Sequence, residues 1–321
     1  MTITKTIPLD AQGAWRTEAY SVLEAGGIIG VPTETVYGLA GDATRSDVID
    51  SIYAAKGRPA YNPLIVHVAD LAMGERYGLF SDTARRLTKA FWPGPLTLVL
   101  PLKAGTGLAA AVTAGGDSLA IRCPQGPLGD LSMTLGRPLA APSANRSGHV
   151  SATSAAHVLE DLGGRIGLIL DGGPSRLGVE STIVDLRGDP QILRPGAISS
   201  DDLAEVLGAV VALADDAEDA KPVAPGQLSS HYAPSVPVRL NVLPGQVLAD
   251  EAYLGFGKHA LEGHQTLSMT GDLGEAACRL YGALRDCDRP GVMGIAIAPI
   301  PAEGIGQALA NRLQRAAAPR A

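Results

Sequence analysis

The chain has 321 residues, of which 46% are hydrophobic, 18% charged and 4% aromatic, and its formal net charge is -7. This composition indicates about two globular domains, excludes a disordered chain, and argues against a protein that coats nucleic acid with a broad basic face. No apolar run approaches the ~20 residues of a membrane helix, so we expect a cytoplasmic protein without a membrane contact. Three cysteines without a CxxC pair argue against a disulfide scaffold or zinc knuckle.

Helices and strands alternate over the first two hundred residues. The apolar patterns predict helices at residues 17–25, 47–55, 81–91, 128–135 and 154–162. They predict strands at residues 28–32, 64–68, 96–100, 118–122, 139–142, 167–171, 181–185 and 191–194, with a loop and a helix start at residues 33–38. Some of these strands lie too close together for crossover helices, so a mixed α/β sheet is predicted rather than a purely parallel one.

The composition changes after residue 208. We therefore predict a first domain at residues 1–208, a linker at residues 209–237 that is rich in Ala, Asp, Pro and Ser, and a small C-terminal α/β domain at residues 238–321. Strands are expected there at residues 238–242, 252–256 and 292–298, and helices at residues 275–286 and 306–316. This part is too short for a full dinucleotide-binding fold.

The loop from Lys56 to Val68 combines cations with residues that restrict the backbone. Lys56, Arg58, Asn62 and His67 lie among glycine and prolines that limit the loop's freedom, a combination typical of an anion site. Lys56 could instead neutralise the C-terminal end of a helix dipole, and a lone strand histidine is commonly a core residue. Arg58, fixed between Gly57 and Pro59, is not explained by the dipole, so a cradle for a triphosphate is the favoured interpretation.

Polar groups also follow or end several other predicted strands. The loop Pro32–Gly38 could hold a small polar ligand, or Thr33 could cap a helix. Ser143, Asn145 and Arg146 follow the strand at residues 139–142 and could contact a phosphate or ribose, or form an Asx/Ser turn. The chain has neither a Gly-x-x-x-x-Gly-Lys-Ser/Thr loop nor a Gly-x-Ser-x-Gly elbow, which disfavours a P-loop ATPase and covalent catalysis.

Five motifs in order resemble the YrdC-like family of L-threonylcarbamoyladenylate synthases. They are Pro32–Leu39, Lys56–Val68, Ser143–Asn145, Ser181–Thr182 and Leu193–Gly196. The segment His231–Pro234 and the small domain after it resemble the long, two-domain form of the family. The resemblance implies a twisted mixed α/β sheet with a large concave basic cavity, followed by a linker and a small Rossmann-like α/β domain.

The resemblance also implies an activity. Such a nucleotidyltransferase converts L-threonine, bicarbonate and ATP to threonylcarbamoyl-AMP and pyrophosphate, for the N6-threonylcarbamoyl modification of adenosine 37 in tRNAs that read ANN codons. Mg²⁺ would accompany ATP, and no residue of the chain is assigned to a metal. A downstream threonylcarbamoyl-transferase complex would take up the product, and a contact with tRNA or double-stranded RNA is compatible with a basic cavity.

The matching motifs imply two sets of site residues. The expected threonine contacts are Thr35, His67, Arg122, Ala141 and Ser181, with Arg122 paired to the threonine carboxylate. The expected ATP contacts are Lys56, Arg58, Asn62, Ser118, Ser143, Asn145, Ser151, Arg194 and Tyr232, of which Lys56 and Arg58 are also assigned to catalysis. Tyr232 would make the linker a lid. Many relatives carry basic residues just before this point, whereas Gln227–Ser230 is neutral here.

Two alternatives stay open at the level of sequence. One is a module that binds double-stranded RNA or tRNA without catalysis, although the acidic charge and the few aromatics weigh against it. The other is an enzyme that adenylates carbamate for a different acceptor, as in related maturation factors. Those factors typically carry acylphosphatase and zinc-finger segments, which this sequence lacks.

Overall fold

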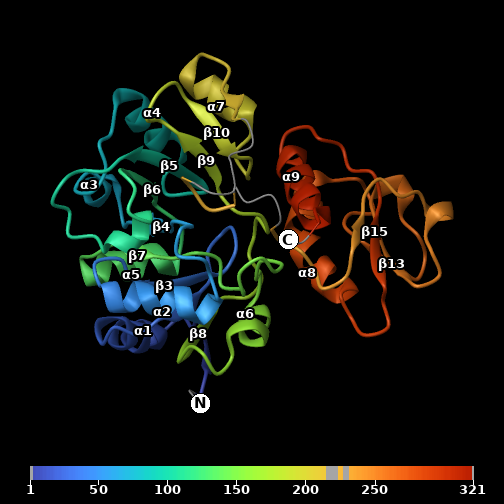
Figure 1. Cartoon of the computed structure of the whole chain (residues 1–321), viewed down its shortest axis with the longest axis horizontal. Coiled ribbons are helices and arrows are strands. Elements are labelled where there is room, and N and C mark those ends of the chain that lie inside the picture. The colour runs from blue at the N-terminus through green and yellow to red at the C-terminus, as the bar shows by residue number, and fades with distance from the viewer. Residues whose placement is uncertain (1–2, 215–222, 227–230, 320–321) are drawn as a thin grey trace.

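The computed structural model describes residues 3–214, 223–226 and 231–319. The neutral segment Gln227–Ser230 and residues 215–222 of the expected linker lie outside the described residues. Figure 1 shows a large α/β unit that contains the N-terminus and a smaller α/β unit built from the last part of the chain. Helices α8 (Leu273–Cys287) and α9 (Gly306–Ala317) lie on the side of the small unit that faces the large one.

The described part of the large unit contains an eleven-stranded mixed sheet, which confirms the predicted architecture. Its strands follow the order β1-β8-β2-β3-β7-β4-β6-β5-β9-β10-β11. Their bounds are β1 (Lys5–Pro8), β2 (Ile29–Val31), β3 (Gly38–Asp42), β4 (Ile65–His67), β5 (Leu96–Pro101), β6 (Ser118–Arg122), β7 (Leu139–Ala140), β8 (Leu168–Asp171), β9 (Thr182–Asp185), β10 (Gln191–Arg194) and β11 (Ala212–Leu213).

Helices connect these strands and begin or end at residues suited to the role. They are α1 (Ala14–Glu24), α2 (Ser46–Lys56), α3 (Leu71–Gly74), α4 (Asp82–Phe91), α5 (Pro127–Leu135), α6 (Ala155–Leu162) and α7 (Ser200–Leu207), with a 3₁₀ helix at Ala110–Thr113. The side chains of Ser81 and Ser154 accept backbone N–H bonds at the starts of α4 and α6. Gly57 ends α2 in a left-handed conformation, with φ of 60°, which turns the chain into the Arg58 loop.

The segment after β2 is not the helix start expected from the sequence. Residues 33–37 form a turn, and β3 (Gly38–Asp42) then runs antiparallel to β2. Strand β3 consists of Gly-Leu-Ala-Gly-Asp, which lacks the β-branched residues that mark a strand. Strands β1 and β11 and helix α7 were not predicted either. Residues 212–213, which the composition places in the linker, pair with β10.

The small unit contains a four-stranded parallel sheet in the order β12-β15-β13-β14. Its strands are β12 (Val238–Arg239), β13 (Glu251–Gly255), β14 (Gln265–Thr266) and β15 (Gly294–Ile297), with 3₁₀ helices at Pro244–Gln246 and Gly257–His259. Its apolar core also takes in Val36, Val150 and Val179 of the large unit. The two units therefore share buried apolar side chains. None of the helices described is long and apolar enough to cross a bilayer.

Candidate functional site

The register of the large sheet brings the predicted site residues to one face. His67 of β4 pairs with Arg122 of β6, and Arg122 in turn pairs with Thr97 of β5. Ile183 of β9 is the partner of both Thr97 and Arg194. Because residues paired across neighbouring strands point to the same side of a sheet, the side chains of His67, Arg122 and Arg194 share a face.

A shift in register decides the direction of Arg194. Ile192 pairs with Val184, but the next paired residue of β10 is Arg194, opposite Ile183. Leu193 is the extra residue of this irregularity. In a regular ladder Leu193 would pair with Ile183, and Arg194 would point to the other side of the sheet. A shift of one residue in register reverses the face to which each side chain points.

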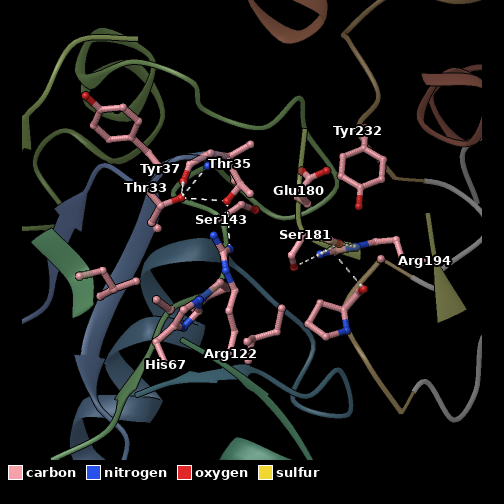
Figure 2. Close-up of a pocket in the computed structure, with 18 of the residues that line it drawn as sticks. Thr33, Thr35, Tyr37, His67, Arg122, Ser143, Glu180, Ser181, Arg194 and Tyr232 are labelled. Carbon is pink, nitrogen blue, oxygen red and sulfur yellow. Dashed lines mark hydrogen bonds between the residues drawn. The ribbon is translucent and has the colours of Figure 1, made fainter. Parts of the chain in front are cut away.

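A cavity lies over this face. Its charged lining residues, among those described, are three arginines and one carboxylate: Arg58, Arg122, Arg194 and Glu180. The remaining lining includes Thr33, Thr35, His67, Ala141, Ser143, Ser181, Pro225, Gly226, His231 and Tyr232. Figure 2 shows Arg122 and His67 toward one end and Arg194 and Tyr232 toward the other, with Ser181 beside Arg194.

Arg122 is held by neighbours from the turn after β2. Its Nη1 donates to Thr35 Oγ1 at 3.0 Å and its Nε donates to the carbonyl of Gly94 at 3.1 Å. Its Nη2 lies 2.8 Å from Glu34 Oε1 and forms an ion pair in which both side chains are buried. Neither oxygen of Glu34 has an aligned hydrogen bond within the described residues, so Coulomb attraction rather than a fixed bidentate bond holds this carboxylate.

His67 lies beside Arg122 as a neutral imidazole. Burial lowers the pKa of His67 well below its usual value, and the charge of Arg122 lowers this pKa further. Its Nδ1 has no hydrogen-bond partner among the described residues and is buried. A neutral ring at this end can accept or donate one hydrogen bond to a ligand without adding charge.

Arg194 and Ser181 form the opposite end. The Nη2 of Arg194 donates to the carbonyl and to Oγ of Ser181, at 3.0 and 3.1 Å, while its Nη1 donates to the carbonyl of Pro225 at 3.3 Å. Ser181 Oγ also lies 2.8 Å from Thr97 Oγ1. Burial lowers the pKa of Arg194 from its usual value. These contacts fix the position of the cation before any ligand arrives.

Tyr232 closes this end in an unusual backbone conformation. Its φ is 63°, which costs a bulky residue roughly 1–3 kcal/mol unless its surroundings enforce it. Its ring stacks on Tyr281, with centroids 5.8 Å apart. A Cβ added at Gly226 would lie 2.7 Å from the Tyr232 hydroxyl and 2.9 Å from Cδ of Arg194, so glycine is needed where the segment passes between them.

Glu180 is a lining residue to which the sequence assigned no role. Its Oε1 accepts from Ser151 Oγ at 2.6 Å, and its Oε2 accepts from the Tyr281 hydroxyl and from Arg312 Nε, both at 2.8 Å. Burial alone would raise the pKa of Glu180, but Arg312, Arg194 and these hydrogen bonds outweigh burial and lower it to about 2. The carboxylate is therefore charged at neutral pH.

Of the two basic residues Lys56 and Arg58, at the end of α2 and in the loop after it, only Arg58 lines the cavity. Arg58 lines the cavity and donates through Nη2 to Asn62 Oδ1 at 2.5 Å and to the carbonyl of Pro63 at 2.8 Å. Burial lowers the pKa of Arg58 to about 10, so it stays charged at neutral pH. Lys56 instead donates to the carbonyls of Ser143 and Asn145 and joins the two loops.

Nine of the fourteen predicted site residues line the cavity, and five do not. The nine are Thr35, Arg58, His67, Arg122, Ala141, Ser143, Ser181, Arg194 and Tyr232. Lys56, Asn62, Asn145 and Ser151 support the walls: Asn62 holds Arg58, Asn145 donates to the carbonyls of Arg146 and His149, and Ser151 donates to Glu180. Ser118 lies farther away, at the start of β6, opposite Pro101 and at the other end of the strand from Arg122.

Several residues of the site were missed from the sequence. Glu34 lies inside the Pro32–Leu39 motif and Glu180 directly precedes Ser181–Thr182, and a carboxylate within or beside a buried motif could have signalled a paired cation. His231 was also overlooked, and burial lowers the pKa of this lining histidine to about 3. Arg312 lies 132 residues after Glu180, and no local pattern links the two.

The described residues do not form a site for Mg²⁺. Among them, no three His, Cys, Asp or Glu side chains gather as metal ligands. The one carboxylate in the lining, Glu180, already accepts three hydrogen bonds. Since Mg²⁺ commonly binds through one or two carboxylates together with waters and substrate phosphates, these residues alone do not provide a complete set of ligands for the ion.

Both units of the chain match known protein families. Residues 21–196 match the Sua5/YciO/YrdC family, described as "Telomere recombination", and residues 198–318 match the family "Threonylcarbamoyl-AMP synthase, C-terminal domain". The chain is 40% identical to the threonylcarbamoyl-AMP synthase of Bacillus subtilis, over 94% of this chain and 93% of the relative. It is 38% identical to that of Schizosaccharomyces pombe, over 90% and 84%. The crystal structure of P. abyssi Sua5 complexed with L-threonine superposes with a TM-score of 0.90 at 35% identity and covers 98% of each chain.

Proposed function

The chain belongs to the Sua5/YciO/YrdC family, and from this premise we propose that it converts L-threonine, bicarbonate and ATP to threonylcarbamoyl-AMP and pyrophosphate. Similarity to threonylcarbamoyl-AMP synthases over nearly the whole chain makes it an enzyme of the nucleotidyltransferase class. The observation that carries the proposal is the convergence of three buried arginines on one cavity that lacks a nucleophile motif. Such a site suits anionic substrates.

In this proposal the Arg122 end binds L-threonine. Arg122 is oriented by Thr35 and by the carbonyl of Gly94, and its Nη2 faces the carboxylate of Glu34. The carboxylate of threonine would take up the free donor capacity of this guanidinium. Neutral His67, Thr35 and Ala141 would surround the rest of the amino acid, and Ser181 would lie between it and the nucleotide.

The Arg194 end would bind the nucleotide. Arg58 and Arg194 supply positive charge for the phosphates, Ser143 offers a hydroxyl, and Tyr232 covers the site. Lys56, Asn62, Asn145 and Ser151 would act through the loops that they hold rather than by lining the cavity. The ATP contact of Ser118, which begins β6 at the end far from Arg122, stays a prediction.

The reaction then needs positioning and charge more than covalent catalysis. The amine of threonine attacks the carbon of CO₂ derived from bicarbonate and loses a proton, which gives a carbamate. A carbamate oxygen attacks the α-phosphorus of ATP, and the bond to the bridging oxygen breaks to release pyrophosphate. The carbamate and ATP are both anionic, so fixed arginines that lie close to the phosphates lower the barrier of this second step by offsetting the repulsion.

Mg²⁺ would reach the site as part of the ATP complex and would help to neutralise the phosphates. No residue of the chain is proposed as its ligand. We further propose that the product serves the N6-threonylcarbamoyl modification of adenosine 37 in tRNAs reading ANN codons, through a downstream transferase complex. Direct contact with tRNA or double-stranded RNA, and the cytoplasmic location, stay predictions.

Pyrophosphate release from ATP tests the proposal. We expect turnover when L-threonine and bicarbonate are both present, and background release when either is omitted in CO₂-free buffer. Mass spectrometry should find the carbon of labelled bicarbonate in threonylcarbamoyl-AMP. Release that does not depend on threonine, or none from folded protein, would refute the assignment.

A further inference from the structure

A fully buried arginine of the C-terminal unit reaches the wall of the cavity. The Nε of Arg312, in α9, donates to Glu180 Oε2 at 2.8 Å, and its Nη2 donates to the carbonyl of Pro195 at 2.9 Å. Its guanidinium lies over the ring of Tyr232, 5.2 Å from the centroid. Glu180 immediately precedes Ser181, and Pro195 immediately follows Arg194. One side chain therefore contacts three segments that carry lining residues.

Tyr281 of α8 contacts two of the same groups. Its hydroxyl donates to Glu180 Oε2 at 2.8 Å, and its ring lies 24° from parallel with the ring of Tyr232. Burial raises the pKa of Tyr281 well above its usual value, so the hydroxyl keeps the proton that it donates. Tyr232 is thus contacted by a guanidinium and an aromatic ring of the C-terminal unit while its backbone is left-handed. Packing of this kind can enforce a conformation that the residue would otherwise avoid.

A second arginine crosses between the units without touching the cavity lining. Arg285 of α8 donates to Asp161 Oδ2 at 2.7 Å and to the carbonyl of Val150 at 2.6 Å, and it pairs with Glu160 at 3.1 Å. None of these three partners is among the lining residues. The chain therefore offers two arginines that dock the same units, of which one contacts Tyr232 and one does not.

We propose that Arg312 is a positioning residue for the nucleotide end of the cavity. Through Glu180, the carbonyl of Pro195 and the ring of Tyr232, it holds the lid residue and the strand ends that carry Ser181 and Arg194. The C-terminal unit thereby takes part in the reaction of the other unit through one buried side chain. The inference rests on the proposed function for the identity of the ligand, ATP.

The test compares Arg312→Met with Arg285→Met in the full chain. Methionine keeps an apolar side chain of similar reach but removes the guanidinium. We expect Arg312→Met to weaken binding of the α,β-methylene analogue of ATP at least 10-fold by calorimetry, and to raise KM for ATP while KM for L-threonine changes less than 2-fold. Arg285→Met should change these values less than 2-fold. Equal losses in both variants, or unchanged nucleotide affinity in Arg312→Met, would overturn the proposal.

Two further variants keep the test decisive if the single substitution does not fold. Glu180→Gln combined with Arg312→Met removes both charges of the ion pair together, and Tyr281→Phe removes one hydroxyl while keeping the ring. Both should weaken binding of the ATP analogue and spare threonine binding, and a failure to do so would also count against the proposal. Binding of the analogue is measured without turnover, so its result stays distinct from a failure of wild-type pyrophosphate release.

Discussion

At one end of the cavity Arg122 is held by groups of the large unit alone, whereas at the other end Tyr232 depends on side chains from α8 and α9. Thr35, Glu34 and Gly94 orient Arg122. Tyr281 and Arg312 contact the ring of Tyr232. The difference indicates that the proposed threonine end is complete within the first unit, while the proposed nucleotide end is assembled by the two units together.

The comparison also separates two uses of a buried carboxylate. Glu34 lies at ion-pair distance from Arg122 without an aligned hydrogen bond and balances the charge of its guanidinium. Glu180 is fully engaged by Ser151, Tyr281 and Arg312 and holds the two units together. One carboxylate balances the charge of a binding site, and the other fixes its geometry.

The largest expected effect is at the threonine end. Arg122→Met should lower kcat/KM about 1,000-fold, because it removes the guanidinium from the substrate carboxylate and leaves Glu34 buried without a cation. Binding of the ATP analogue should stay within 3-fold of wild type. Steady-state pyrophosphate release and calorimetry measure both, with exposed Arg76→Met as the matched control. Turnover within 10-fold of wild type would remove Arg122 from the threonine site.

Arg58→Ala is the next largest change and acts on the nucleotide side of the comparison. We expect turnover to fall about 100-fold, since one of the two phosphate-facing cations is lost, while circular dichroism shows an intact fold. Threonine affinity should change little. Unchanged turnover would exclude Arg58 from the site, and a parallel loss of threonine binding would show that the two ends are not separate.

The pH dependence of stability tests the role of Glu180 between the units. Its pKa is lowered to about 2 in the folded protein from 4.5, so the stabilisation is fully present above about pH 4.5 and is lost as the pH falls toward 2. This lowering of the pKa corresponds to about 3 kcal/mol in the free energy of unfolding. Urea unfolding should show a free energy of unfolding that is higher for wild type than for Glu180→Gln by about this amount at pH 7. This difference should disappear as the pH falls toward 2. A difference that does not depend on pH would contradict the ion pair with Arg312.

The smallest expected effect concerns the segment beside Tyr232. Gly226→Ala adds a methyl group where the Tyr232 hydroxyl and Arg194 leave no space, so KM for ATP should rise about 3- to 10-fold. Gly208→Ala is the matched control. Gly208 has a positive φ of 72°, close to the 85° of Gly226, but a Cβ added to it would meet no atom within 4 Å. If both variants behave alike, backbone strain rather than the nucleotide end explains the effect.

Local patterns in the sequence were sufficient for most of the large sheet and for the lining arginines. The strands that carry His67, Arg122 and Arg194 are apolar runs bounded by turn residues, and each of these three residues ends its run. Strand β3 escaped prediction because its glycines and alanine gain their strand conformation from neighbours. Ser118 and Arg122 lie at opposite ends of β6, a separation that the run of residues 118–122 already implies.

The part of the site that the sequence did not predict depends on long-range contacts. Glu180 and Arg312 meet across 132 positions, and Tyr281 reaches the same oxygen from another helix. In the sequence α9 is an ordinary amphipathic helix, and nothing distinguishes Arg312 from an arginine on the surface. Only the packing of the two units shows that this arginine is buried.

Binding of the two substrates to paired variants tests the central claim most directly. Equilibrium dialysis would measure labelled L-threonine and the α,β-methylene analogue of ATP separately, with wild type, Arg122→Met and Arg312→Met. We predict that Arg122→Met no longer binds threonine but still binds the nucleotide analogue. Arg312→Met should bind the analogue at least 10-fold more weakly and should still bind threonine. Loss of both ligands in both variants, or the reverse pattern, would contradict a cavity with one end intrinsic to the first unit and one end assembled by the two.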